Sequence, residues 1–278
     1  MKKKLDVTSY ILNSENLPAS FDGCRIGFLT DLHDNEIGVD NEGLINRIKK
    51  QTYDFFLCCG DMIVGSDKGI FEYQNALKFF EKIAKIAPVY YSLGNHEERM
   101  RKAKLIEEND TLDTYKEALL NRNVTVLDNE TITLSKEGEN ICIKGISLSM
   151  DYYKRWWNRK SLSDTQINEM IGKKKEFTIL LAHNPVFFET YDSYGTELIL
   201  SGHVHGGLMV LPILGGVISP ELKLFPKYDF GYFEGNTSKM ILSRGLGTHT
   251  LPIRIHNRPE FIDITLKRAC DFSGQLVE

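Results

Sequence analysis

The chain has 278 residues, 42% of them hydrophobic and 26% charged, with a formal net charge of −4 at pH 7. This length and composition suit one large α/β domain or two small ones, and we expect a single domain over 1–278. The net negative charge provides no positive electrostatic field that would attract a phosphate backbone, which argues against general nucleic-acid binding. A phosphorylated small molecule or protein remains as the partner.

The cysteines and the N-terminal residues indicate the cellular compartment of the protein. No apolar core of a signal peptide follows the basic start of residues 1–18, and no run of 18 apolar residues occurs anywhere. We therefore predict a cytoplasmic protein without a transmembrane segment. Reduced thiols are expected because the cysteines are odd in number and lack paired spacing: Cys24, Cys58, Cys59, Cys142 and Cys270.

The predicted elements begin with three short apolar runs at 25–30, 54–59 and 88–93, separated by helix-length segments at 41–51 and 70–86. This order predicts a β-α-β-α-β start with parallel strands. Later apolar runs follow one another mostly without long helices, so we expect a second sheet packed on the first. These runs are 131–135, 141–147, 177–183, 197–203, 207–212, 239–245 and 261–266.

Polar residues follow five of these strands, in the segments "DLHDNEIG", "GDMIVG", "GNHEE", "HNP" and "GHVHGG". Ligands of open α/β sheets gather at the carboxyl ends of strands, so these segments can converge on one place. The candidate metal ligands there are Asp31, His33, Asp61, Asn95, His183, His203 and His205.

The donor atoms of this set are carboxylate oxygens, imidazole nitrogens and an amide oxygen, with no thiolate sulfur. Such a set suits Mn, Fe or Zn rather than a structural zinc site. Seven ligands are too many for one ion but fit two ions bridged by one carboxylate, the arrangement that serves attack on phosphorus. In an extended segment His203 and His205 project the same way, so each can reach a different ion. The flanking Gly202, Gly206 and Gly207 allow the backbone to approach closely.

Each motif alone also has an ordinary structural explanation. "DLH" fits a solvated turn, and His183 fits a satisfied histidine at a strand end. "GNH" fits a helix start with Asn95 as N-cap and Glu97 and Glu98 near the positive end of the helix dipole. The joint pattern favours metal, because five of the seven histidines fall in these motifs.

The motifs "DLH", "GD", "GNHE", "AHNP" and "GHVHGG", in this order, resemble the calcineurin-like metallophosphoesterase superfamily. The segment "SRGLGTHTLPIRIHNRPEF" resembles its bacterial single-domain phosphohydrolase branch, some members of which are membrane-associated. The resemblance implies an α/β fold, a four-layer α/β/β/α sandwich of two packed mixed β-sheets flanked by helices. It also implies hydrolysis of phosphomonoesters or phosphodiesters with two divalent transition metal ions, manganese first and iron or zinc as alternatives.

By motif position, the resemblance assigns Asp31, His33 and His205 to the first metal. It assigns Asn95, His183 and His203 to the second metal, Asp61 to the bridge, and His96 to contact with the phosphoryl oxygen or leaving group. A water or hydroxide between the ions would be the nucleophile. A non-catalytic scaffold on the same fold is the alternative, but scaffolds typically lose ligands or the "GNH" histidine, and this chain keeps them.

Three further features remain. Cys58 and Cys59 precede "GD", where we expect core packing, with thiol sensitivity of the site as the alternative. Arg244 is the first candidate for a phosphate contact, followed by Arg254 and Arg258. His256 is expected in a surface or core role.

The segment "MDYYKRWWNRK" at 150–160 predicts an amphipathic helix with an aromatic face and a largely basic remainder. One interpretation is a helix that faces the core. The other is an aromatic and basic lip beside the site, suited to a lipid-linked or nucleotide substrate or to peripheral contact with a membrane.

Overall fold

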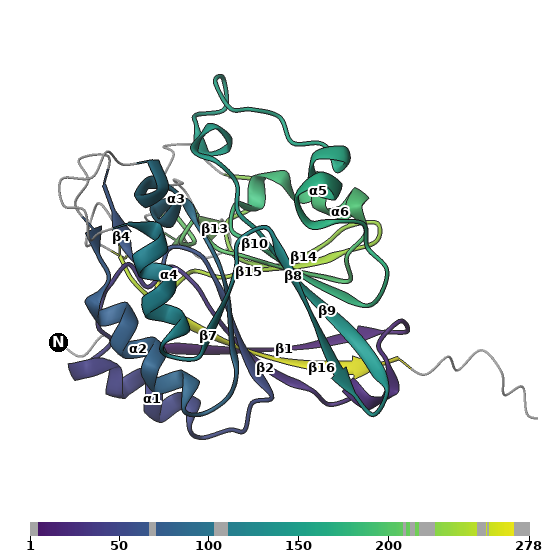
Figure 1. The fold of residues 1–278 in the computed structure, drawn as a ribbon, viewed down its shortest axis with the longest axis horizontal. Coiled ribbons are helices and arrows are strands. Elements are labelled where there is room, and N and C mark those ends of the chain that lie inside the picture. The colour runs from purple at the N-terminus through teal and green to yellow at the C-terminus, as the bar shows by residue number, and fades with distance from the viewer. Residues whose placement is uncertain are drawn as a thin grey trace, which may run out of the picture.

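The structure is a computed structural model that describes residues 5–66, 71–102, 111–207, 210–211, 215–216, 226–248, 254 and 256–269. Its centre is a pair of six-stranded mixed sheets that pack face to face (Figure 1). The first sheet has the order β1 (Asp6–Ser14), β16 (Glu260–Arg268), β2 (Arg25–Leu29), β3 (Phe55–Cys59), β6 (Val89–Ser92), β7 (Val124–Leu127). The second has the order β14 (Gly231–Glu234), β15 (Lys239–Leu242), β11 (Leu198–Ser201), β10 (Thr178–Ala182), β9 (Glu139–Ile146), β8 (Glu130–Lys136).

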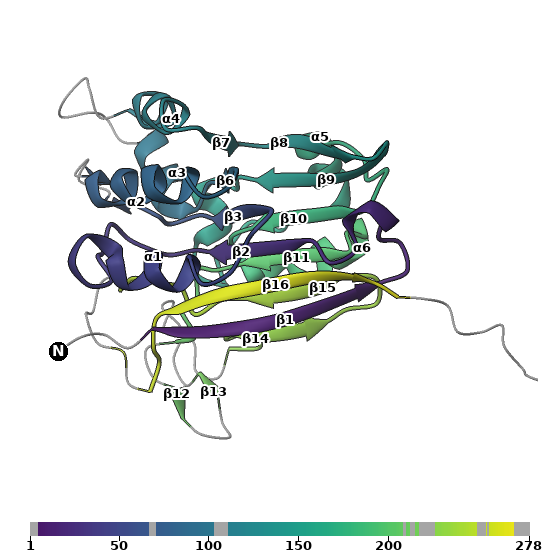
Figure 2. The same ribbon diagram turned by 90° about the horizontal axis from the view of Figure 1, so that it is seen from below.

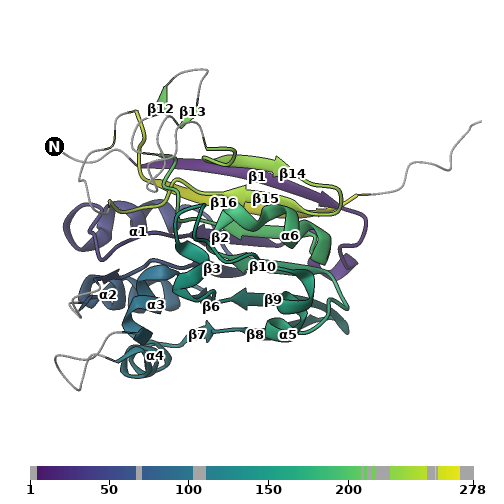
Figure 3. The same ribbon diagram turned by 90° about the horizontal axis from the view of Figure 1, so that it is seen from above.

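Helices cover the outer face of each sheet, which confirms the predicted four-layer sandwich. Figure 2 shows the strands of the first sheet in their order, and Figure 3 shows α5 and α6 over the second sheet. The first sheet packs on α1 (Glu42–Ile48), α2 (Gln74–Ala84) and α4 (Leu112–Leu120), while α3 (Asn95–Lys102) begins where β6 ends. The second sheet packs on α5 (Asp164–Ile171) and α6 (Phe188–Tyr194).

Alternation along the strands produces the layers. In β10, Ile179 and Leu181 lie between the two sheets, whereas Leu180 and Ala182 face α5 and α6. Parallel strands that are buried on both faces appear in a sequence as continuous apolar runs, which is why these strands were predictable.

The adjacent cysteines of β3 follow the same alternation. Cys59 packs between the sheets and Cys58 packs under the helices, and both are fully buried. Burial raises the pKa of both thiols, so they stay protonated. The core-packing interpretation is confirmed, and the four cysteines among the described residues all carry free thiols.

The predicted start of the fold is confirmed, because β2, β3 and β6 pair in parallel. The second helix begins at Gln74 rather than at 70, since β5 (Phe71–Glu72) pairs with β4 (Val64–Gly65) in a short antiparallel ladder. Of the predicted strand at 207–212, the structure describes β12 (Val210–Leu211), which pairs with β13 (Gly215–Gly216).

The placement of the last strand in the second sheet was wrong. β16 belongs to the first sheet, where it lies parallel to β1 and antiparallel to β2. β1 and β7 were not predicted. β1 is an edge strand that leaves Val7 and Ile11 exposed, so its apolar residues do not mark a buried strand.

The helix predicted over 150–160 is also wrong. A single 3-10 turn, η3 (Met150–Tyr153), is followed by a loop in which Lys160 N donates to Asp151 O at 3.1 Å. The backbone therefore pairs across the base of a loop instead of along a helix. Tyr152 is buried, but Trp156 and Trp157 are 69% and 56% exposed, so the tryptophans do not face the core.

Across the described residues, every helix falls short of the length and apolar content that a membrane-spanning helix needs.

Candidate metal centre

The predicted ligands come together because five strands end at the same place. Asp31 and His33 follow β2, Asp61 follows β3, and Asn95 follows β6. In the second sheet His183 follows β10, and His203 and His205 follow β11. Backbone bonds extend the pairing beyond the sheet, since Asp31 N donates to Gly60 O at 3.1 Å and His33 N donates to Asp61 O at 3.0 Å.

The side chains form overlapping clusters whose ligand atoms lie within 4.8 Å of one another: Asp31, His33 and His205; His33, Asp61 and His96; Asp61, His183 and His203. The first cluster holds His33 and His205, and the last holds His183 and His203. His33 belongs to the first and second clusters and Asp61 to the second and third, so these two residues connect the clusters. The Asn95 side chain is buried, and its Oδ1 has no hydrogen-bond partner in the described part of the chain.

Ring nitrogens and carboxylate oxygens face each other across the centre. His33 Nε2 and His205 Nε2 are 3.0 Å apart, and His205 Nε2 is 3.3 Å from Asp31 Oδ1. His183 Nε2 is 3.1 Å from Asp61 Oδ2. Acceptors this close attract one another only if a proton or a cation lies between them.

The tautomer of His183 shows the effect. Its Nδ1 lies 2.7 Å from the carbonyl oxygen of Cys59 and donates to it, so the neutral ring directs an Nε2 lone pair at Asp61. Burial works to lower the pKa of His183, but the Asp61 carboxylate outweighs burial and raises that pKa well above its ordinary value. The site therefore demands positive charge at this nitrogen, which a proton or a metal ion can supply.

The ionisation of the other groups suits metal binding. Burial acts to raise the pKa of both Asp31 and Asp61, but the surrounding imidazoles outweigh burial and hold both values below the ordinary range. Burial lowers the pKa of His205 to about 3, so this ring is neutral at physiological pH. Ionised carboxylates and neutral imidazoles are the forms that ligate metals.

The backbone is strained at these residues. Positive φ angles occur at Asp31 (53°), His33 (48°), Asp61 (52°), His203 (71°) and His205 (52°). Each such conformation costs about 1–3 kcal/mol and persists where the surroundings enforce it, which is common at functional sites. His203 and His205 are therefore not in an extended segment as predicted; a turn, rather than strand alternation, sends them to different clusters.

Comparison with known proteins adds the family. The model of the calcineurin-like phosphoesterase family matches residues 24–207, the span that holds the clusters described above. The chain belongs to the calcineurin-like phosphoesterase family. An uncharacterized metallophosphoesterase of Bacillus subtilis, YkuE, is 28% identical over 272 residues, which cover 95% of this chain and 86% of the relative.

Two further proteins are similar to this chain. An uncharacterized metallophosphoesterase of Aquifex aeolicus is 27% identical over 267 residues, which cover 95% of this chain and 92% of the relative. The solved structure of phosphopantetheinyl hydrolase from Mycobacterium tuberculosis is 10% identical with a TM-score of 0.45, covering 80% of this chain and 89% of that chain. Membership is established by the family model alone.

In this calcineurin-like family member, Glu97 organises the loops that carry Asp61 and Asn95. Its buried carboxylate accepts hydrogen bonds from Asp61 N at 3.0 Å, Met62 N at 3.0 Å and Gly94 N at 2.8 Å. The sequence analysis assigned Glu97 only to the positive end of a helix dipole and did not predict this role. Its position directly after "GNH" was a signal, but its partners lie in the loops after β3 and before α3.

Glycines give the carboxylates their space. A Cβ on Gly94 would lie 2.3 Å from Asp61 Oδ1, and a Cβ on Gly202 would lie 2.3 Å from Asp31 Oδ2. Real contacts of this kind do not come so close, so a larger residue at either position would displace a candidate ligand.

Asn257 is a second residue that the sequence did not reveal. This buried side chain donates to His205 O at 2.5 Å and to Gly207 O at 2.9 Å, so it holds the turn after β11. The neighbouring His256 is exposed, as the surface interpretation predicted.

His96 faces the clusters with a hydrogen-bond donor beside each ring nitrogen. Gly65 N donates to His96 Nδ1 at 2.8 Å, which leaves Nε2 as the nitrogen that faces Asp61. That Nε2 is 3.9 Å from Asp61 Oδ2, and the Arg99 guanidinium lies 3.0 Å from it. The backbone amide of His96 donates to Asp61 Oδ1 at 2.8 Å, which fixes the bridging candidate.

The three candidate arginines have different surroundings. Arg244 Nη2 donates to Glu260 at 3.0 Å, and its substrate role stays a prediction. Arg258 pairs with Asp6 at 3.4 Å on the outside. Arg254 lies against the centre, with Nη2 3.3 Å from His205 Nδ1, and its buried Nη1 has no hydrogen-bond partner among the residues that the structure describes.

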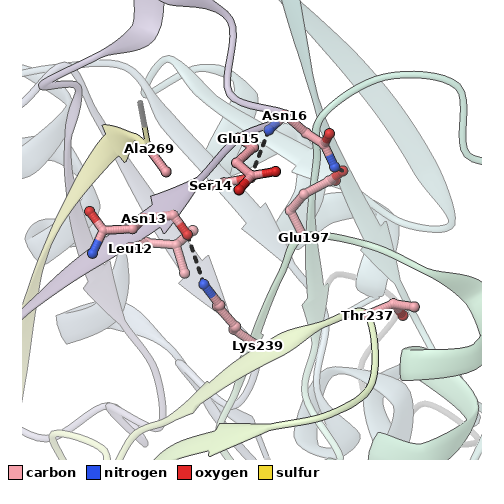
Figure 4. Close-up of a pocket in the computed structure, with 9 residues that line it drawn as sticks. All are labelled: Leu12, Asn13, Ser14, Glu15, Asn16, Glu197, Thr237, Lys239 and Ala269. Atoms are coloured by element: carbon pink, nitrogen blue, oxygen red, sulfur yellow. Dashed lines mark hydrogen bonds between the residues drawn. The ribbon is translucent and has the colours of Figure 1, made fainter. Parts of the chain in front are cut away.

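A separate polar hollow of about 390 Å³ lies near the start of β11 and β15, at the edge opposite the metal-ligand clusters (Figure 4). Lys239 Nζ donates there to Asn13 O at 2.7 Å, and Glu197 accepts from Thr178 N at 2.8 Å. These groups serve the fold, so we place the functional site at the clusters.

Proposed function

We propose that this protein is a metal-dependent phosphoester hydrolase that uses two divalent transition metal ions. One observation carries the proposal. The carboxylate and imidazole side chains, five of them on strained backbone, direct oxygen and nitrogen atoms into one place that requires positive charge. Manganese is the first choice of metal, with iron and zinc as alternatives, because the donors are nitrogen and oxygen without a thiolate.

The proposed ligands follow the observed clusters. Asp31, His33 and His205 hold one ion, Asn95, His183 and His203 hold the other, and Asp61 bridges them. The residues present fit such a pair, since Asn95 Oδ1 is buried without a hydrogen-bond partner in the described part of the chain. Buried polar atoms are seldom left in this state unless a ligand completes them.

The bound ions supply a nucleophilic oxygen and neutralise charge on the phosphoryl group. The residues around the ions contribute the remaining catalytic and binding groups. Because Gly65 N–H occupies His96 Nδ1, a proton that this ring gives to a phosphoryl or leaving oxygen would leave from Nε2, the nitrogen beside Arg99. Burial lowers the pKa of Arg254 to about 10, which leaves it cationic at neutral pH and able to bind a phosphate oxygen beside His205.

The substrate is proposed to be a phosphorylated small molecule or a lipid-linked phosphoester, monoester or diester. The free, buried thiols of the described cysteines support the proposal that the protein works in the reducing cytoplasm.

The test is turnover of a nitrophenyl phosphate monoester, its diester and a nucleotide pyrophosphate, after chelation and with added manganese. We expect metal-dependent turnover of at least one, abolished by Asp61→Asn and retained by the control Asp113→Asn, a change at an exposed residue of α4. Absence of metal-dependent turnover on every substrate by folded protein would favour the scaffold alternative.

A further inference from the structure

The loop of residues 151–160, here called the tryptophan loop, projects beyond the sandwich. In Figure 1 the teal segment between β9 and α5 rises to the upper edge of the molecule. The loop is closed at its base by the bond from Lys160 N to Asp151 O, and a turn near its tip joins Asn158 N to Arg155 O at 2.8 Å. Trp156 and Trp157 therefore lie on a closed loop and are the most exposed large aromatic side chains in the described part of the chain.

The base of the loop is part of the wall of the metal centre. Asn184, the residue after His183, donates from Nδ2 to Tyr152 O at 3.1 Å. The ring of Tyr153 lies 5.1 Å from the ring of His203 and 6.3 Å from that of His183. Only Lys154 and Arg155 separate Tyr153, which packs against a candidate ligand, from the exposed tryptophan pair. The loop therefore links the site to whatever the tryptophans contact.

The charge of the loop is opposite to that of the chain. Four cationic residues and one aspartate lie within it, whereas the whole chain has a net charge of −4. The Arg155 guanidinium lies 5.4 Å from the ring of Trp157, and Lys160 Nζ lies 5.1 Å from the ring of Tyr152. A cationic group thus lies beside the tryptophan pair, and a second one lies at the base of the loop.

We propose that the tryptophan loop docks the protein onto an anionic lipid bilayer, with Trp156 and Trp157 in the headgroup region. Indole rings favour this interface because one part is apolar and the other donates a hydrogen bond. Lys and Arg beside them are attracted to anionic lipids. Docking in this way turns the metal centre toward phosphate-bearing headgroups, and that consequence rests on the proposed function.

Single-stranded nucleic acid fits the loop less well. Bases stack on aromatic rings that present their faces along one groove. The rings of Trp156 and Trp157 meet edge to face at 88° with centroids 5.6 Å apart, so they do not form a common stacking surface.

The chain supplies its own probe, because its only two tryptophans both lie in this loop. Wild-type protein in chelator, without substrate, is titrated with vesicles of phosphatidylcholine alone or mixed with phosphatidylglycerol. We expect a blue shift of tryptophan emission and quenching by brominated acyl chains with the mixed vesicles only. Unchanged emission would overturn the proposal, and since no turnover is measured, this outcome leaves the proposed catalysis intact.

Variants locate the contact by vesicle sedimentation. Trp156→Ala with Trp157→Ala should abolish binding, and Arg155→Glu with Lys160→Glu should weaken it roughly fivefold or more for each reversed charge. The control Lys49→Glu with Lys50→Glu makes the same charge change on exposed residues after α1, at the lower edge in Figure 1, and should bind nearly as wild type. Equal loss in the control, or an emission shift with an oligonucleotide but not with vesicles, would contradict docking on lipid.

Discussion

Asp61 is held from two directions at the point where both halves of the proposed centre meet. His96 N donates to its Oδ1, and its Oδ2 faces His183. Its own backbone amide is fixed by Glu97. The carboxylate is therefore oriented before any ion binds, which lowers the reorganisation needed on binding.

We expect Asp61→Asn to lower kcat by several orders of magnitude, and by more than His203→Ala or His205→Ala. The reason is that the bridging position contributes charge shared by two cations, whereas each histidine serves one. Steady-state kinetics with saturating manganese compares the three variants. Turnover near wild type in Asp61→Asn would show that the bridge is assigned to the wrong residue.

For His96→Ala we expect both metals to be retained and a loss of roughly 10²-fold or more on alkyl esters, in line with general-acid catalysis. The loss on nitrophenyl esters should be clearly smaller, because nitrophenolate leaves without a proton. The measurement is kcat/KM over a leaving-group series for both proteins, with metal content determined in each sample. Parallel dependence on the leaving group would mean that His96 stabilises charge on the phosphoryl group instead.

At this scale the sequence predicted which side chains meet, because the motifs follow strands that end at one edge. It did not predict how they are held. Asp31 and His203 have positive φ angles, and the partners Asp61 of Glu97 and His205 of Asn257 are distant in sequence. Such contacts leave no local pattern.

At the scale of elements, helix α3 carries Asn95 and His96 and is tied to the first sheet by Asp128, which follows β7. Arg101 Nη2 contacts both carboxylate oxygens of Asp128 at 2.8 Å, and Lys116 of α4 pairs with the same group. Burial would raise the pKa of Asp128, but Lys116 and Arg101 outweigh it and lower the pKa.

This shift predicts a pH-dependent contribution to stability. A lowered pKa means that the folded state favours the ionised carboxylate, so the contribution is present above the unfolded value of about 4 and is lost as the pH falls below it. Asp128→Asn should cost about 1 kcal/mol at neutral pH and progressively less in acid. Urea midpoints for wild type, Asp128→Asn and the exposed control Glu117→Gln test this; a difference that does not change with pH would refute the ion-pair explanation.

Elements were predictable where burial on both faces gives a continuous apolar run, as in β10 and β11. The 150–160 segment misled because its aromatic spacing fits a helix, although the tryptophans have no layer to pack against. Spacing reports which side chains share a face only when the backbone is helical, and here the loop closes on itself.

At the scale of the molecule, the candidate ligands come from both sheets, so metal binding should tie the two halves of the sandwich together. We expect manganese to raise the melting temperature of chelated protein, since the ligands converge only in the folded state. At 100 times the dissociation constant, each site adds about 2.7 kcal/mol. Differential scanning calorimetry of wild type and His203→Ala should show a smaller rise in the variant, and equal melting temperatures with and without manganese would rule out this coupling.

The sandwich itself was predictable from the motif order, but the sheet that receives β16 was not. Ile262, Ile264 and Leu266 pack in the layer between the sheets, and both sheets present apolar residues to that same layer. The alternation of the strand is therefore compatible with either sheet, and only its pairing with β1 and β2 decides the matter.

The number of ions per chain tests the two-metal centre most directly. Metal-free protein is titrated with manganese at equilibrium, and bound metal and turnover are measured in the same samples. A bridged pair predicts two ions per wild-type chain, full turnover only when both are bound, and one ion in His203→Ala. A reproducible stoichiometry of one ion per wild-type chain with full activity would contradict it.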